Sequence, residues 1–135
     1  MSNEVDSTHD FDQLGGVEGI KPIIQSFIDK VYGDMIIGFL FINVDKEQLI
    51  AREVEFASRH LGGSVSYTGK PIGPVHRKHP INKGHFHRRL WLLGNTLDEH
   101  GVNPDIKERW LSHNRQLEPV ITDGTDCVAP QTTAP

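Results

Sequence analysis

Apolar residues recur every three or four positions along most of this chain, and this spacing constrains the fold more than any other feature. Residues 20–31, 50–61, 86–97 and 106–121 each carry such a line. The period matches one face of an amphipathic helix, whereas the strict alternation of a half-buried strand persists nowhere. We therefore predict an all-α fold of about four substantial helices joined by short helical pieces.

Turn and capping residues indicate where the first helices begin and end. Gly15 and Gly16 turn the chain before the first helix, and Gly33 stops that helix. The short apolar stretch 35–42 follows, and we expect it to form a buried turn of helix. Asp45 is placed to cap the next helix. A later helix is expected from about residue 82 to residue 99, and a last one through residue 121.

The helix after Asp45 carries two adjacent lines of side chains. The first line is apolar and consists of Ile50, Val54, Ala57 and Leu61. The second has the same spacing but is mixed, and consists of Leu49, Glu53, Phe56 and His60. We expect the first line to face the core. The second line either borders the core or overlooks a cavity, and periodicity alone slightly favours the border.

Length and composition limit the classes of protein to consider. A chain of 135 residues fits one domain large enough to bury a core. Polar composition predicts disordered segments at residues 1–10 and 123–135 around a folded domain at residues 11–122. The net charge of −4 argues against binding to nucleic acid or to an anionic membrane. No apolar run approaches the roughly 20 residues of a membrane span.

Cysteine content and the N-terminal sequence bear on the compartment. The single cysteine, Cys127, excludes a disulfide within one chain. The N-terminal segment is acidic and polar, unlike a secretory signal. We expect a cytoplasmic protein.

A Gly- and Pro-rich loop within residues 61–86 separates two helical patterns and leads into a cluster of histidines. Its candidate chemical residues are His76, His79, His85 and His87. These histidines are exposed and idle, or they bind zinc, or one of them binds haem iron on a short helix that faces a cavity. Zinc is the weaker of the two ligand hypotheses, because the spacing fits no familiar closed site and no cysteine lies nearby.

Short motifs in a fixed order resemble those of the truncated haemoglobins, the two-over-two globins, and most closely their first group. The resemblance spans about residues 11–121 and rests on Gly15-Gly16, Phe27, Val54-Glu55-Phe56, Leu61-Gly62-Gly63, Tyr67-Thr68-Gly69, Pro71, Val75-His76, Ile81, His85-Phe86 and Gly101-Val102. It implies a two-over-two helical sandwich around one b-type haem. The family's proximal histidine, which binds the iron, falls on His76.

Haem is flat and apolar and carries two propionates, so its pocket needs apolar faces and a cationic rim. The expected apolar lining is Phe41, Leu49, Phe56, Ile81, Phe86 and Leu93. The expected propionate partners are Arg52, Lys70 and Arg77, each of which fits a solvated surface position equally well.

The distal side, where a ligand would bind the iron, departs from the family pattern. Ile28 replaces the usual tyrosine, and Glu53 replaces a glutamine. Ile28 and Leu49 cannot donate a hydrogen bond. Arg89 falls where related groups carry a tryptophan. Glu53 and Arg89 either pair across the pocket or both turn to solvent, and the cost of burying an isolated charge favours solvent.

The resemblance implies a globin that reversibly binds a diatomic gas (oxygen, nitric oxide or carbon monoxide). We expect oxygen to leave quickly unless Arg89 donates a hydrogen bond in the place of the tyrosine. An enzyme is the alternative, either a nitric-oxide dioxygenase or a peroxidase-like protein that uses Glu53 with Arg89, and served by an unidentified reductase. A haem-based redox or gas sensor, and a haem-free module, complete the set of hypotheses.

Overall fold

The computed structural model describes residues 10–65 and 81–122 of the chain. Its elements, in chain order, are α2 (Gly16–Tyr32), η1 (Gly38–Phe41), α3 (Lys46–His60), α5 (Lys83–Glu99), α6 (Pro104–Arg115) and α7 (Glu118–Thr122). Within these two ranges there is no β-strand, which agrees with the predicted all-α fold. No helix among them is long and apolar enough to cross a membrane.

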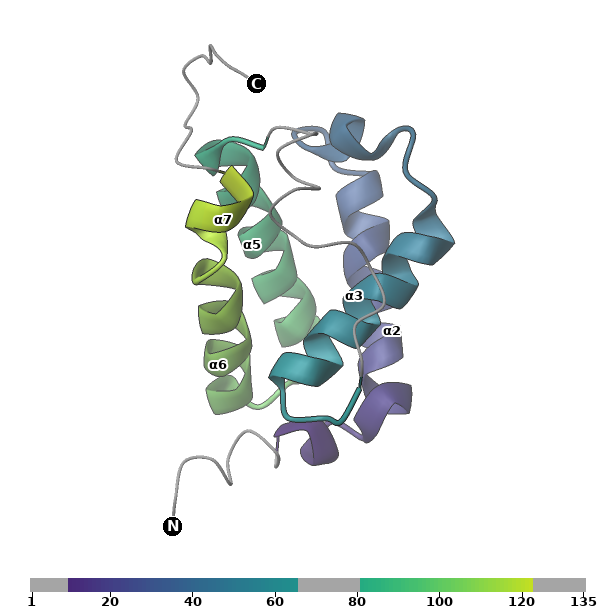
Figure 1. The fold of residues 1–135 in the computed structure, drawn as a ribbon, viewed down its shortest axis with the longest axis vertical. Helices are drawn as coiled ribbons and strands as arrows, with labels where there is room; N and C mark the ends of the chain where they lie inside the picture. The colour runs from purple at the N-terminus through teal and green to yellow at the C-terminus, as the bar shows by residue number, and fades with distance from the viewer. Residues whose placement is uncertain (1–9, 66–80, 123–135) are drawn as a thin grey trace.

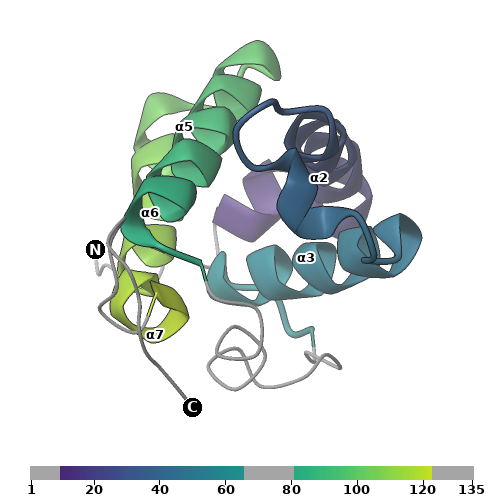
Figure 2. The same ribbon diagram turned by 90° about the horizontal axis from the view of Figure 1, so that it is seen from above.

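The helices form two pairs that face each other. Helix α2 packs against α3, and α5 packs against α6, while α2–α5 and α3–α6 contacts join the two pairs. Figures 1 and 2 show α5 and α6 side by side on one flank of the molecule and α2 with α3 on the other. The core between them is built from the predicted apolar lines and includes Phe27, Leu93, Leu97 and Trp110, each at most 2% exposed.

The start of α2 depends on glycine. Gly15 and Gly16 have φ angles of +94° and +70°, which side chains other than glycine rarely adopt. They reverse the chain as the sequence predicted. The helix begins at Gly16, so Pro22 lies inside it rather than in its first turn.

Capping residues fix the ends of α3 and α5. The Asp45 carboxylate accepts a hydrogen bond from the Gln48 amide at 3.0 Å, as predicted. Asn82 accepts from the His85 amide at 2.8 Å, and His85 Nδ1 accepts in return from the Asn82 amide at 3.4 Å. These caps satisfy backbone N–H groups that have no partner within the helix and so fix where α3 and α5 begin.

The prediction of one last helix through residue 121 is wrong. Helix α6 ends at Arg115, and α7 begins at Glu118. Pro119 has no N–H to donate to a carbonyl one turn earlier, so a continuous helix would lose a hydrogen bond there. The chain restarts instead, with Pro119 in the first turn of the new helix, where a missing N–H costs nothing.

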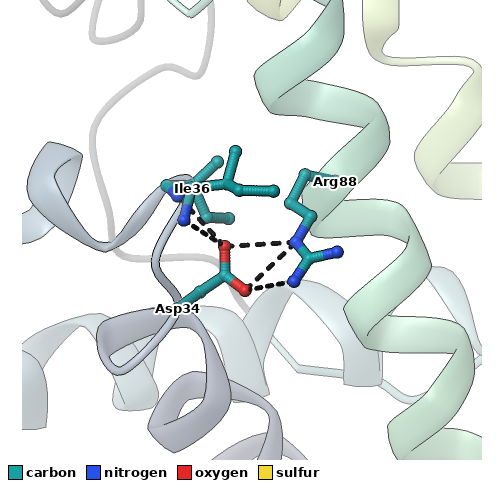
Figure 3. Close-up of polar contacts among 4 residues, drawn as sticks. Asp34, Ile36 and Arg88 are labelled. Carbon is teal, nitrogen blue, oxygen red and sulfur yellow. Dashed lines mark hydrogen bonds and ion pairs between the residues drawn. The ribbon is translucent and has the colours of Figure 1, made fainter.

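The prediction of a buried turn of helix at residues 35–42 is confirmed for the helical turn, which is η1, but wrong for its burial. Only Ile37 is buried, whereas Met35 is 97% exposed and Ile42 80% exposed. Figure 3 shows what holds this corner in place: the Asp34 carboxylate accepts hydrogen bonds from the amides of Ile36 and Ile37 at 3.0 Å. The other carboxylate oxygen, Oδ1, accepts two hydrogen bonds from the Arg88 guanidinium of α5. The distances are 3.1 Å from Nε and 2.7 Å from Nη2. The tight turn lets only one side of the segment reach the core.

Candidate functional site

The mixed line of α3 lies over a small enclosed cavity. The apolar line of Ile50, Val54, Ala57 and Leu61 is buried in the core, as predicted. One step round the helix, Glu53, Phe56 and His60 line the cavity. Both interpretations of the mixed line hold in part: all four residues are half-buried at the border of the core, and three of them also line the cavity, whereas Leu49 does not.

Four helices contribute to this cavity, which lies between the two helix pairs. Its lining residues are Ile24 and Phe27 of α2; Glu53, Phe56, Ala57 and His60 of α3; Arg89 and Leu93 of α5; and Trp110 and Asn114 of α6. Its volume of about 10 Å³ is room for about one water molecule. The lining mixes aromatic rings with three polar groups and one imidazole.

A chain of hydrogen bonds crosses the cavity from α3 to α6. Arg89 Nη2 donates to Glu53 Oε1 at 3.0 Å, and Arg89 Nη1 donates to Asn114 Oδ1 at 3.0 Å. Asn114 is buried, and its amide nitrogen donates to the Trp110 carbonyl at 3.0 Å. That last bond fixes the amide so that its oxygen faces Arg89. The guanidinium is therefore held on two sides.

The expectation that Glu53 and Arg89 turn to solvent is wrong. Their side chains are only 24% and 20% exposed, and they form an ion pair. Burial is costly for an isolated charge, but neither charge is isolated here. Arg89 also lies over the Phe27 ring, 4.9 Å from its centroid, where the ring face attracts a cation. Charge-assisted hydrogen bonds of this kind are roughly twice as strong as neutral ones.

His60 forms the end of the cavity. Its ring stacks on His113 of α6, with centroids 4.6 Å apart, and meets the Phe56 ring edge-on at 5.1 Å. Both ring nitrogens are buried, and neither has a hydrogen-bond partner in the structure. Burial lowers the pKa of His60 to about 3, and the neighbouring His113 and Arg89 add to the shift because they disfavour a second positive charge. His60 is thus neutral at physiological pH.

The other predicted distal residues supply no donor. Ile28 is 2% exposed in the core, and Leu49 is half-buried against it. Tyr32 lies one turn beyond Ile28, but its hydroxyl donates to the Val44 carbonyl at 2.8 Å. Tyr32 holds the segment after η1 and does not line the cavity. Among the predicted distal positions, Arg89 alone carries N–H groups at the cavity.

The predicted cofactor-lining residues divide into buried and half-buried groups. Phe86 and Leu93 are buried, at 2% and 1% exposure. Phe41, Leu49, Phe56 and Ile81 are half-buried. Of these six residues, Phe56 and Leu93 line the cavity described above. All six are apolar, as a flat apolar group such as haem requires, and their role in lining it stays a prediction.

Of the predicted iron ligand and propionate partners, the structure describes only Arg52. Arg52 is 3.4 Å from Glu55 on the same helix, where it forms an ion pair. His76, Lys70 and Arg77 lie outside the described residues, so their predicted roles stay predictions. The same holds for His79.

Two of the four histidines proposed as zinc ligands make other contacts. His85 caps α5, as described above, and His87 Nε2 lies 3.1 Å from a Glu118 carboxylate oxygen. In the described ranges no three His, Cys, Asp or Glu side chains converge as a metal site would require.

Sequence reasoning missed Asn114. It lies four residues after Trp110, on the inward face of α6, and a buried amide at such a position needs a polar partner. The spacing of four residues from Trp110 was the signal in the sequence that could have identified Asn114. The partner, Arg89, is on a different helix and could not be read from the chain order.

Comparison with known proteins agrees with this architecture. The model of the bacterial-like globin family matches residues 9–122. The group 1 truncated haemoglobin GlbN of Mycolicibacterium paratuberculosis is 29% identical over 114 residues, which cover 84% of each chain. The group 1 truncated haemoglobin GlbN of a Synechocystis species is 28% identical over 100 residues, covering 71% of this chain and 81% of that protein.

Solved structures share the fold. The 2/2 haemoglobin of Synechococcus, in the cyanomet state and with covalently attached haem, superposes with a TM-score of 0.80 at 20% identity, covering 84% of this chain and 98% of that one. The ferric truncated haemoglobin of Tetrahymena pyriformis gives a TM-score of 0.77 at 24% identity, covering 83% and 96%. The chain therefore belongs to the bacterial-like globin family and has the two-over-two fold of the truncated haemoglobins.

Proposed function

We propose that this globin holds a b-type haem through His76 and reversibly binds a diatomic gas with Arg89 as the hydrogen-bond donor to the ligand. Family membership supports haem and gas binding. The observation that carries the distal assignment is the fixed position of Arg89 between Glu53 and Asn114, at 3.0 Å from each. We further propose that the protein acts in the cytoplasm.

The residues proposed to hold the haem combine one ligand, an apolar lining and a cationic rim. The lining comprises Phe41, Leu49, Phe56, Ile81, Phe86 and Leu93, and the rim comprises Arg52, Lys70 and Arg77. When bound, the haem would supply an iron atom that can take a gas ligand. The chain would hold the iron through His76, exclude water with its aromatic side chains and present a donor to the ligand.

Arg89 compensates for the missing tyrosine. Bound oxygen carries partial negative charge, and a charge-assisted hydrogen bond to it is worth roughly 1.5–3 kcal/mol. A guanidinium has five N–H groups, of which Glu53 and Asn114 engage two, so donors remain for a ligand. At about 1.4 kcal/mol per factor of ten, this donor slows oxygen release by about one to two orders of magnitude.

The test compares oxygen release in Arg89→Leu with release in the wild-type protein. We expect release to become about 10- to 100-fold faster in the variant, with carbon monoxide release changed far less because bound carbon monoxide is less polar. The double variant Arg89→Leu/Glu53→Leu controls for repulsion by an unpaired carboxylate without introducing a new donor. If the double variant releases oxygen at the wild-type rate, Arg89 is not the donor.

The Glu53–Arg89 pair also favours a second candidate, oxidative enzyme chemistry. A carboxylate that accepts a proton beside a cation that stabilises negative charge is what peroxide cleavage needs. Turnover of hydrogen peroxide with an electron-donor dye, measured in the wild type and in Glu53→Gln, tests it, and loss of turnover in the variant is expected. A nitric-oxide dioxygenase would additionally need a reductase partner, and nitric-oxide consumption by the oxygenated protein tests that activity.

A further inference from the structure

His60 carries two hydrogen-bonding nitrogens for which the described residues supply no partner. The residue lines the small cavity between the helix pairs, and both ring nitrogens are buried. Its neighbours are rings: His113 stacks on it, and Phe56 and Trp110 meet it edge-on, with centroids 5.1 and 6.4 Å away. Buried polar groups nearly always have a partner, either in the protein or in ordered water. The imidazole therefore calls for a partner beyond these neighbours.

The cavity beside His60 has the size and the lining that a water molecule needs. Its volume of about 10 Å³ corresponds to one water molecule. An internal water molecule typically makes two to four hydrogen bonds. Arg89 and Asn114 also line the cavity, and each keeps N–H groups beyond those in its bonds to Glu53, Asn114 Oδ1 and the Trp110 carbonyl. Donors are thus present on the cavity wall in addition to the imidazole.

We propose that this cavity is a site for water and not for an apolar gas, and that one internal water molecule in it hydrogen-bonds His60. Water both donates and accepts, so it can pair with a ring nitrogen that carries a proton or with one that does not. The proposal goes beyond the gas-binding function and does not depend on it, because the ring, the cavity and the polar lining all belong to the chain itself.

A dry cavity is the alternative. Cavities lined by aliphatic and aromatic side chains alone stay dry and take up apolar guests such as xenon. Here four of the ten lining residues are polar or charged: Glu53, His60, Arg89 and Asn114. Without water, His60 would keep a buried hydrogen-bonding nitrogen unpaired, which is costly away from solvent. The composition of the wall therefore favours water.

Crystallography of the wild-type protein at high resolution tests the site without any substitution. We expect a single peak of water density about 2.7–3.2 Å from a ring nitrogen of His60. A crystal held under xenon pressure should contain no xenon in this cavity. Xenon bound there would overturn the proposal. So would a His60 ring with no density beside it, or one that is hydrogen-bonded to another side chain.

Magnetic relaxation dispersion of water oxygen-17 tests the same site in solution, because it counts long-lived internal water molecules. The measurement uses the ferrous carbon monoxide form, in which any haem iron is diamagnetic. His60→Phe keeps an aromatic ring but has no hydrogen-bonding atom, so it should hold one water molecule fewer than the wild type. His60→Gln keeps a donor and an acceptor and should retain the wild-type count.

Circular dichroism establishes that both variants are folded before the counts are compared. Equal counts in the wild type and in His60→Phe would contradict the proposal, and so would loss of the water molecule in His60→Gln. If His60→Phe does not fold, the wild-type crystal with and without xenon still decides the question.

Discussion

His60 is buried in the folded protein, and burial opposes protonation of its ring. Its folded-state pKa is about 3, against about 6.5 for a free histidine, because burial disfavours the charged ring. Between these two pH values the unfolded chain binds a proton that the folded chain does not. Stability is therefore full above pH 6.5 and falls progressively as the pH drops toward 3.

We expect this histidine to remove about 2 kcal/mol of folding stability between pH 7 and pH 5. The measurement is urea unfolding of the wild type and of His60→Phe at both pH values. The variant keeps an aromatic ring beside Phe56 and His113 but cannot bind a proton, so its loss over the same interval should be smaller by that amount. Equal losses in the two proteins would show that His60 does not oppose protonation in the folded state.

For single residues, the sequence identified the important side chains more reliably than it predicted their contacts. The resemblance to the truncated haemoglobins implied that Glu53 and Arg89 are distal residues. Their pairing was not, because it depends on Asn114, which fixes the guanidinium from a third helix. The position of one charge cannot be predicted while its partner is unknown.

The corner between α2 and η1 depends on one carboxylate. Asp34 accepts hydrogen bonds from two backbone amides and from the Arg88 guanidinium of α5. Its side chain is 5% exposed, and the Arg88 hydrogen bonds are the main reason its pKa is lowered. The corner therefore connects the two helix pairs of the sandwich.

Substituting Asp34→Leu should lower the melting temperature by roughly 5–10 °C, since it removes these hydrogen bonds, and those from the Ile37 amide and Arg88 are partly buried. Thermal unfolding followed by circular dichroism measures it. Glu99→Gln is the matched control: it weakens the Lys30–Glu99 ion pair, in which Glu99 is 57% exposed, and should shift the melting temperature by only about 1–2 °C. Similar shifts for both substitutions would contradict the assigned role of Asp34.

At the scale of whole elements, the helices with capping residues were predicted well. Asp45 and Asn82 cap α3 and α5 because local hydrogen bonds decide those ends. The burial of segment 35–42 was mispredicted, because apolar composition alone does not show whether the rest of the molecule covers a turn. The last helix was predicted too long. The apolar spacing continues across Pro119, but the helical backbone hydrogen bonds are interrupted there.

The two helix pairs are also joined near the N-terminus. Asp10, expected in a disordered segment, is 2% exposed and accepts two hydrogen bonds from Arg109 of α6 at 2.7 and 2.9 Å. The Phe11 amide donates to the Leu61 carbonyl at 3.0 Å, and the Phe11 ring lies where any side chain at Gly63 would stand. The folded region thus begins at least one residue earlier than expected.

A chain that starts at residue 10 should keep nearly full stability, whereas one that starts at residue 11 should lose about 2 kcal/mol, because the two Asp10–Arg109 hydrogen bonds are removed. Urea unfolding of both chains measures the difference. Asp10→Asn in the full-length chain separates the charge from the truncation and should reproduce most of the loss. No difference between the two truncated chains would show that Asp10 is dispensable.

Over the whole molecule, the account depends on haem bound through His76, and the visible absorption spectrum tests this most directly. The purified ferrous protein with carbon monoxide should show a strong Soret band. His76→Gly should lose the wild-type spectrum and regain a similar one when imidazole is added, while His79→Ala and His85→Ala should retain haem. A wild-type protein without a Soret band, or a His76→Gly variant with an unchanged spectrum in the absence of imidazole, would contradict the account.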